Sequence, residues 1–149
     1  MKLKIKAVSP SIGREIPKPY YATAGAAAMD LCACIGEAVT LAPGERTSLP
    51  TGLAIQLPSA DYVALVFARS GLGIKHGVAL SNGVGVIDSD YRGEIRVGLC
   101  NGGDAPYTIQ PGDRVAQLMI TPVARASVLE LEELPQTARG TGGFGSTGK

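Results

Sequence analysis

The sequence predicts an all-β fold: a single-domain β-sandwich or jelly-roll-like barrel with one short helix. Twenty glycines and ten prolines are spread along the 149 residues, which is typical of short strands joined by many turns. Val, Ile and Thr are abundant, and apolar residues alternate with others within 53–57 and again within 63–67. A chain of this length buries about two thirds of its unfolded surface, which is enough for one core.

Composition excludes several classes of partner. The formal net charge is +1, there is no basic run, and the only aromatic residues are two Phe and five Tyr, so the sequence predicts neither a nucleic-acid groove nor a membrane surface. Three cysteines (Cys32, Cys34 and Cys100) cannot all pair, and no second Cys or His pair completes a zinc site. With no signal-peptide or membrane-spanning pattern at the N-terminus, we expect reduced cysteines and a cytoplasmic location. His76, the only histidine, is expected to lie in a loop.

Strands joined by tight turns are expected along much of the chain. Lys2–Ala7 alternates apolar residues with lysines and predicts a strand with one solvent face. Ala42–Arg46 and Gln110–Arg114 each contain Pro-Gly, which suits a type II turn, and they predict matching corners of a sandwich. Residues 53–57 and 63–67 are predicted to pair as a hairpin.

One helix is expected near the middle of the chain, and the composition changes toward the C-terminus. Arg69–Gly77 breaks the β pattern and predicts one short helix, with Ser70 as its cap. Val115–Pro122 predicts a strand that carries Gln117, and Val128–Leu131 another short one. Residues 136–149 are rich in Gly, Thr and Ser, so we expect domain 1–135 to be followed by a mobile arm, 136–149.

Asn82–Val97 is the segment that bears most directly on function. Its alternating ends predict a hairpin, and the tip, Asp88–Gly93, is a tight polar turn with Gly93 available for a positive φ. Gly83 and Gly85 leave one strand without side chains at two positions, which is typical of a place where a ligand or another backbone comes close. An ordinary surface hairpin with a charged tip explains the same residues.

Five motifs, in order, resemble those of the trimeric dUTPases (deoxyuridine triphosphate nucleotidohydrolases). The resemblance covers nearly the whole chain from Ala22, and the second, third and fifth motifs are the specific ones. Met29 departs from the family, which often has Tyr before the acid of the first motif. The matching segments are Ala28–Leu31, Ala68–Leu72, Gly85–Gly93, Gly112–Leu118, and Arg139 with Gly142–Gly148.

The resemblance implies a Mg²⁺-dependent enzyme that hydrolyses dUTP to dUMP and pyrophosphate. Such an activity lowers dUTP and supplies dUMP for thymidylate synthesis. Water would attack the α-phosphorus, with Asp88 as the general base. Asp30 would reach the Mg²⁺ through water, while the substrate phosphates hold most of the ion. A turn-capping role for Asp88 and a satisfied strand-end role for Asp30 are the structural alternatives.

The resemblance also assigns residues to each part of the substrate. Arg69, Ser70 and Gly71 would bind phosphate oxygens, and Gln117 would lie by the α-phosphate, although a bond to a neighbouring strand also explains a lone amide. Tyr91 would pack on the deoxyribose, or serve only as a packed turn aromatic. The base slot would be lined by Asn82, Val86, Ile87 and Arg96. From the arm, Phe144 would stack over uracil, beside Gly145, while Arg139 and Ser146 close on the γ-phosphate; a plain disordered tail is the alternative.

In this family three chains form a ring and each site takes motifs from all three, so the resemblance implies a homotrimer. Two other functions compete with dUTP hydrolysis. A deoxycytidine triphosphate deaminase shares the fold but needs a glutamate base near the hairpin and a different phosphate motif. A non-catalytic trimeric scaffold or nucleotide sensor would not need Asp88, Arg69 and Phe144 together.

Overall fold

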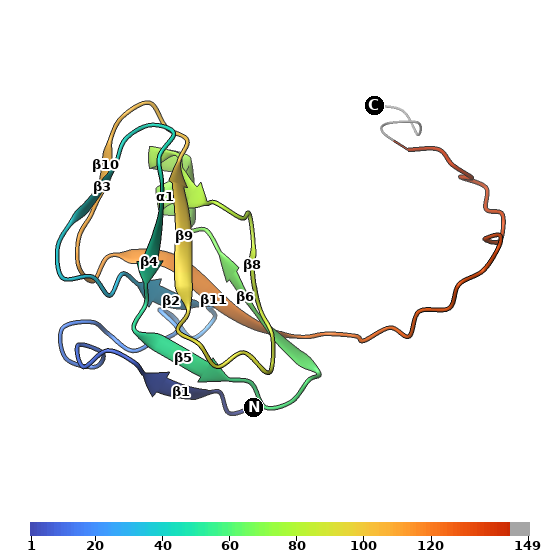
Figure 1. Cartoon of the computed structure of the whole chain (residues 1–149), viewed down its shortest axis with the longest axis horizontal. Helices are drawn as coiled ribbons and strands as arrows, with labels where there is room; N and C mark the ends of the chain where they lie inside the picture. Colours follow the sequence, from blue (N-terminus) through green and yellow to red (C-terminus); the bar gives the residue numbers. More distant parts are fainter. Residues whose placement is uncertain (144–149) are drawn as a thin grey trace.

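The computed structural model describes residues 1–143 and is built almost entirely from short strands (Figure 1). Eleven strands and one helix in this part of the chain confirm the all-β prediction with a single short helix. No described helix is long and apolar enough to cross a lipid bilayer. The elements are β1 (Lys4–Ala7), β2 (Met29–Cys32), β3 (Val39–Leu41), β4 (Arg46–Pro50), β5 (Leu53–Gln56), β6 (Tyr62–Phe67), α1 (Ser70–His76), β7 (Val78–Leu80), β8 (Gly85–Ile87), β9 (Arg96–Asn101), β10 (Tyr107–Ile109) and β11 (Arg114–Pro122).

The strands form two larger sheets and two two-stranded ribbons. One sheet has the order β2-β11-β6-β8 and the other β4-β9-β7, while β1 pairs with β5 and β10 with β3. All of these pairings are antiparallel. β11 is a central strand, since it pairs with β2 at its N-terminal end and with β6 along the rest of its length. Its mostly apolar sequence is typical of a strand that is covered on both faces.

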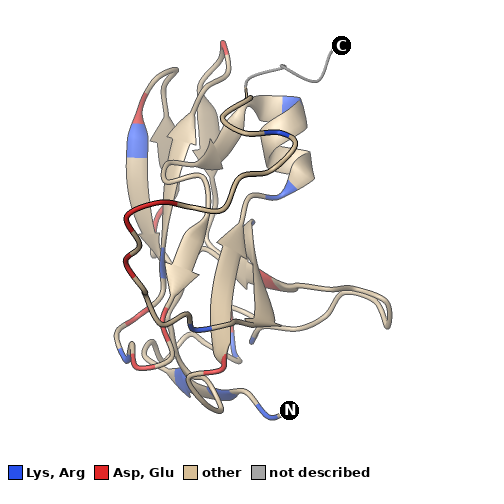
Figure 2. Ribbon diagram, turned by 90° about the vertical axis from the view of Figure 1, so that its right-hand side faces the viewer, with Lys and Arg blue, Asp and Glu red and all other residues tan. Residues whose placement is uncertain are grey.

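A single hydrophobic cluster joins both larger sheets. Leu31, Ala64 and Leu118 come from the four-stranded sheet, and Val97 and Leu99 from the three-stranded one, and all are nearly inaccessible to solvent. Positions of basic and acidic residues are interspersed along the backbone (Figure 2). The core therefore lies between the sheets, as a sandwich requires.

The two Pro-Gly turns are matching corners, as the sequence predicts. They follow β3 and β10, which pair with each other. In each turn the glycine has a positive φ, +82° at Gly44 and +83° at Gly112, which is the value that the third position of a type II turn requires. In each turn a carboxylate also accepts a hydrogen bond from a backbone N–H. Glu45 accepts from the Ala42 N–H, and Asp113 accepts from the Gln110 N–H.

Both predicted hairpin pairings are wrong. Residues 53–56 form β5, which pairs with β1, whereas residues 62–67 form β6, which pairs with β11 and β8. In the same way β8 pairs with β6, while β9 pairs with β4 and β7. The alternation of apolar residues marked each strand correctly, but it does not say which strand supplies the hydrogen bonds.

Three local expectations also need correction. Lys4–Ala7 is exposed on both faces, so β1 has no buried side. Arg69 occupies the N-cap of α1, no side chain caps the helix, and Ser70 is the first helical residue. Gly93 is not among the described glycines with positive φ.

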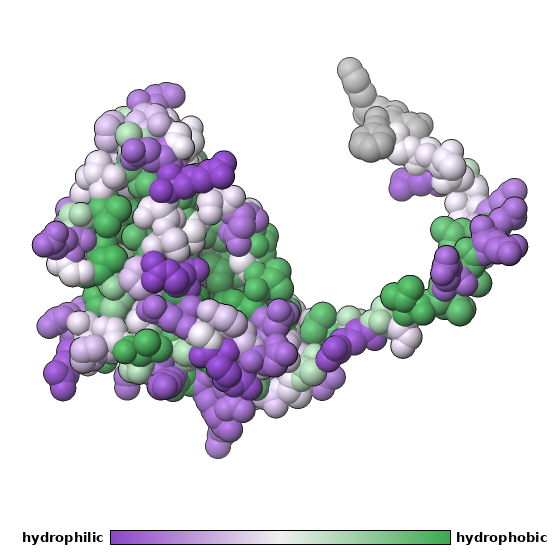
Figure 3. Space-filling view, viewed as in Figure 1, coloured by the Kyte–Doolittle hydropathy of each residue, from purple (hydrophilic) through white to green (hydrophobic). Residues whose placement is uncertain are grey.

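The predicted strand at Val128–Leu131 is wrong as well. After β11, residues 123–143 contain neither helix nor strand and lead away from the sheets (Figure 1). Figure 3 shows hydrophobic side chains along this extended segment. Val128, Leu129, Leu131 and Leu134 are among the exposed large apolar residues, so nothing within residues 1–143 covers the side chains that suggested a strand.

Candidate active site

A cavity of about 280 Å³ lies between β8 and β9, and we call it the β8–β9 slot. It exists because its two walls belong to different sheets. β8 is the last strand of its sheet, so its outer edge has no strand partner among residues 1–143. β7 pairs only with Leu99–Asn101 of β9, which leaves Arg96 and Val97 facing the slot. Six residues that the sequence analysis selected line it: Asn82, Val86, Ile87, Asp88, Tyr91 and Arg96.

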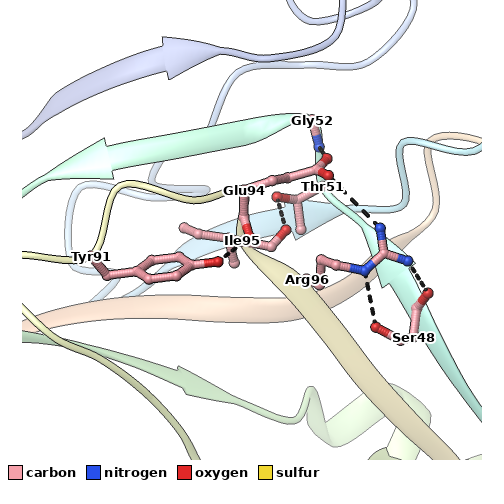
Figure 4. A network of polar contacts seen from close by, with 7 residues as sticks. All are labelled: Ser48, Thr51, Gly52, Tyr91, Glu94, Ile95 and Arg96. Carbon is pink, nitrogen blue, oxygen red and sulfur yellow. Dashed lines mark hydrogen bonds and ion pairs between the residues drawn. The ribbon is translucent and has the colours of Figure 1, made fainter.

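The wall formed by residues 94–96 is held from behind, by the corner between β4 and β5 (Figure 4). The Thr51 hydroxyl donates to the Ile95 carbonyl at 2.6 Å, and the Thr51 N–H donates to the same oxygen at 3.2 Å. The Gly52 N–H donates to Glu94 Oε1 at 2.8 Å. These contacts take over the support that a hairpin partner would otherwise give.

Arg96 points its guanidinium toward that corner. Its Nη2 donates to the Ser48 carbonyl at 2.7 Å and its Nε to the Ser48 hydroxyl at 3.2 Å, while Nη1 lies 3.8 Å from Glu94 Oε2. The Arg96 guanidinium is therefore occupied by protein groups, and this residue contributes to the wall rather than a free charge.

Tyr91 lies across Gly93 at the tip of the slot. Its hydroxyl donates to the Glu94 carbonyl at 3.0 Å, and a Cβ at position 93 would overlap that hydroxyl. Gly93 is needed here for room, not for a positive φ. The ring is partly exposed and available to a ligand in the slot.

A second cavity, of about 200 Å³, is lined by Asp30, Arg69, Ser70, Arg114 and Gln117 together with three alanines, and we call it the Asp30 pocket. Asp30 lies in β2, where it pairs opposite Gln117 of β11. Its carboxylate receives Arg69 Nε at 2.9 Å and Arg114 Nη1 at 3.1 Å. The β8–β9 slot and the Asp30 pocket share no lining residue.

Arg114 is a site residue that the sequence analysis did not single out. The hydrogen bond to Asp30 raises the pKa of Arg114 above its ordinary value. Burial, assisted by the Asp30 charge, also raises the pKa of the neighbouring Cys32 thiol. The signal was the single arginine of the fourth motif, at the start of the strand that pairs with the strand carrying Asp30.

Two further phosphate-binding candidates, Ser70 and Gln117, line the Asp30 pocket. Gln117 Nε2 donates to the Ala68 carbonyl at 2.8 Å, so the amide also bonds a neighbouring segment. Ser70 and Gly71 begin α1 with exposed side chain and backbone. Arg139 lies in the segment after β11 and lines neither cavity, while Phe144, Gly145 and Ser146 lie outside the described residues.

A metal at this site would depend on the substrate for most of its ligands. No group of three His, Cys, Asp or Glu within residues 1–143 could enclose an ion. Asp30 is a single carboxylate whose two oxygens each keep a lone pair beyond the arginine contacts. That donor set fits Mg²⁺, which keeps several waters and binds through one or two carboxylates and substrate phosphates.

Comparison with known proteins identifies the family of this chain. The family model for dUTPase matches residues 14–148. The chain belongs to the dUTPase family. It is 49% identical over 148 residues to the deoxyuridine 5'-triphosphate nucleotidohydrolase of Serratia proteamaculans, covering 99% of this chain and 97% of that one. The protein is accordingly an enzyme of nucleotide metabolism, which hydrolyses dUTP to dUMP.

Two solved phage structures share the fold. The dUTPase of Staphylococcus bacteriophage 80alpha, solved with dUpNHpp, is 26% identical, with a TM-score of 0.85 and 99% of both chains covered. A mutant dUTPase from phage phi11 of S. aureus, described with a structural Mg(II) ion, is 24% identical, with a TM-score of 0.76, covering 89% of this chain and 98% of that one. The sandwich with one short helix is therefore the family fold.

Proposed function

We propose that the β8–β9 slot binds the deoxyuridine of dUTP and that Asp88 is the general base of the reaction. The observation that carries the proposal is that residues 82–96 open a slot between two sheets instead of closing as a hairpin. Asn82, Val86, Ile87, Asp88, Tyr91 and Arg96 all line this one space. Perturbation of either wall should therefore act on binding of the nucleoside.

Main-chain groups supply the base selection in this proposal. The outer edge of β8 and residues 96–97 offer N–H and C=O groups that lack strand partners on the slot side among the described residues. Uracil presents two carbonyls around one N–H, which complements such edges. Cytosine presents an amino group in place of a carbonyl and leaves groups unpaired, a mismatch that costs on the order of 10⁴ in selectivity. The methyl group of thymine would clash, and Tyr91 against the deoxyribose would exclude a 2′-hydroxyl.

The Asp30 pocket would take the phosphates. Arg69, Ser70 and Gly71 would bind phosphate oxygens through guanidinium, hydroxyl and backbone N–H, and Gln117 would lie by the α-phosphate. Asp30 would hold Mg²⁺ through water, and the ion, when bound, neutralises phosphate charge. Arg69 and Arg114 hold the Asp30 carboxylate in place from two sides.

The chemical step is in-line attack of water on the α-phosphorus. Asp88 orients the water and accepts its proton while the new P–O bond forms. The bond from the α-phosphorus to the oxygen bridging to the β-phosphate breaks, and pyrophosphate leaves with that oxygen. The products are dUMP and pyrophosphate.

A single chain keeps its two candidate sites apart, which supports a homotrimer with shared sites. The slot and the Asp30 pocket have no residue in common, so a slot from one subunit would meet an Asp30 pocket from a neighbour. The exposed apolar residues of 128–134 supply surface for such an assembly. Residues 136–149 would form the arm that closes over the substrate, with Phe144 on uracil and Arg139, Gly145 and Ser146 near the phosphates. Mg²⁺ as cofactor and the cytoplasm as compartment complete the proposal.

The test is pyrophosphate release from dUTP, dCTP, TTP and UTP with Mg²⁺, using the wild type and Asp88→Asn. We expect turnover of dUTP alone, and a fall in kcat of about 10²- to 10⁴-fold in Asp88→Asn, because the amide cannot accept the proton. Asp90→Asn is the matched control, since Asp90 is a second acid of the same tip that does not line the slot.

Equal losses in the two variants would mean that the tip needs negative charge and not a base at Asp88. Hydrolysis of all four nucleotides would show that the slot does not select the base. Ammonia release from dCTP would point instead to the deaminase branch of this fold.

A further inference from the structure

Thr51 is a fully buried polar residue that lines none of the cavities described above. Its exposed fraction is 1%, and among residues 1–143 only Asn101 is a comparably buried polar residue. Both the hydroxyl and the N–H of Thr51 are directed at one atom, the Ile95 carbonyl oxygen, at 2.6 and 3.2 Å. A buried side chain whose hydrogen bonding serves a segment 44 residues away fixes the position of that segment.

Four residues make up this support, and we call them the Thr51 clamp: Thr51, Gly52, Glu94 and Ile95 (Figure 4). Gly52 donates its N–H to Glu94 Oε1 at 2.8 Å, and the Ile95 N–H donates to the Leu53 carbonyl at 2.7 Å. The corner packs closely on the core, because a Cβ on Gly52 would approach Cys34 Sγ to 2.8 Å. The clamp thus joins one wall of the slot to a tightly packed part of the core.

The Thr51 hydroxyl is the strongest member of this support. Arg96 also holds the wall, but its side chain is 50% exposed and its contacts with Ser48 compete with water. The bond from Thr51 to Ile95 is short and shielded from water, so its loss leaves a buried carbonyl poorly satisfied. The wall would then shift to find another partner.

The same wall positions two recognition elements. Residues 94–96 line the slot, and the Glu94 carbonyl accepts the Tyr91 hydroxyl at 3.0 Å. Movement of this wall therefore displaces both the base-facing backbone and the ring proposed to pack on the sugar. Selection by unpaired groups requires these parts to be held to about 0.5 Å.

We propose that Thr51, through the Thr51 clamp, is a positioning residue for selection of both uracil and deoxyribose. This inference rests on the proposed role of the β8–β9 slot. Thr51 itself does not touch the nucleotide. It keeps the wall of residues 94–96 at the distance from β8 at which cytosine and ribose are rejected.

The experiment compares kcat/KM for dUTP, dCTP and UTP in the full-length enzyme with Thr51→Val and Thr51→Ser. Thr51→Val keeps the shape and removes the hydroxyl, and we expect it to reduce the dUTP/dCTP and dUTP/UTP preferences together, each by about tenfold or more. Thr51→Ser keeps the hydroxyl and should retain both preferences. Thr40→Val is the matched control, because Thr40 bonds only Thr108 across β3 and β10 and lines none of these cavities.

A purely structural Thr51 gives a different result. Thr51→Val would then lower the Tm and reduce kcat/KM for all three nucleotides by one common factor, leaving the preferences unchanged, which overturns the proposal. If Thr51→Val does not fold, Glu94→Ala removes the other side-chain contact of the clamp. We expect the same joint loss of preference, and unchanged preferences in folded Glu94→Ala also overturn the proposal.

Asn82→Ala separates failure of this inference from failure of the proposed function. Asn82 lines the slot but takes no part in the clamp. If Asn82→Ala alters the dUTP/dCTP preference and Thr51→Val does not, the slot is the base site and only the positioning role fails. If neither alters it, the slot does not select the base and both proposals fail.

Discussion

Gly93 controls the position of the Tyr91 ring. The ring lies so close to Gly93 that any side chain there would overlap its hydroxyl, and that hydroxyl donates to the Glu94 carbonyl. Gly93 lacks a positive φ, so backbone freedom does not explain the glycine. The need for a glycine at this position is a need for space beside an aromatic ring.

Gly93→Ala should therefore displace Tyr91 and break its bond to Glu94. We expect the preference for dUTP over UTP to fall by about tenfold, because a displaced ring no longer blocks a ribose 2′-hydroxyl. Steady-state kinetics with the two nucleotides measure this. Gly36→Ala is the control, since a Cβ at Gly36 meets nothing within 4 Å. An unchanged preference in Gly93→Ala would remove Tyr91 from sugar selection.

The element that presents Arg69, Ser70 and Gly71 is a helix of only seven residues, α1. A helix this short is not stable by itself, so contacts at its ends decide where it lies. It ends at Gly77, whose φ is +68°, and Gly77 lies against the backbone of Gly103. Asn101 fixes that loop by donating to Leu41 and Ala105 carbonyls at 2.9 Å each and accepting the Gly103 N–H.

Gly77→Ala should lower the free energy of unfolding by about 3 kcal/mol, because the left-handed backbone costs roughly 1–2 kcal/mol for alanine and the Cβ overlap adds about 1–3 kcal/mol. Urea unfolding measures this loss. Gly44→Ala is the matched control: its φ is +82°, but a Cβ there meets nothing within 4 Å. It should lose only the backbone part, about 1 kcal/mol. Equal losses would show that the approach of Gly103 does not constrain the helix.

At the scale of the whole molecule, the chain after β11 exposes apolar side chains that a globular protein usually covers. Val128 is 97% exposed, and Leu129 and Leu134 are more than 80% exposed. Three glutamates are interspersed with them, and no described part of this chain packs against the segment. Contact with other subunits would cover these residues in the proposed trimer.

The double variant Leu129→Ser, Leu134→Ser should weaken that assembly. We expect sedimentation equilibrium to give a mass of three chains for the wild type and a smaller, concentration-dependent mass for the variant. Ile74→Ser serves as the control, because Ile74 is also 85% exposed but lies on α1, away from this segment in the chain. A trimeric double variant would mean that other surfaces hold the subunits together.

Local sequence patterns were enough to predict the fold class, the single helix after Arg69 and the two Pro-Gly corners. These follow from local physics: the period of apolar residues, the φ that glycine permits in a turn, and the break in alternation before Gly77. The motifs also selected residues that lie close together, since all six candidates from residues 82–96 line one slot. Family membership was predicted from the five motifs.

The pairing of the strands could be seen only in the folded molecule. The sequence predicts one hairpin from residues 53–57 and 63–67 and another from the strands on either side of Asp88. In the structure each of these strands pairs with a strand other than its predicted partner. A period of two shows that a strand has two faces, but its partner is selected by burial across the whole chain. For the same reason the sequence could not reveal that Arg114 bonds Asp30 or that Thr51 supports Ile95, because 84 and 44 residues separate these pairs and only the packed core brings them together.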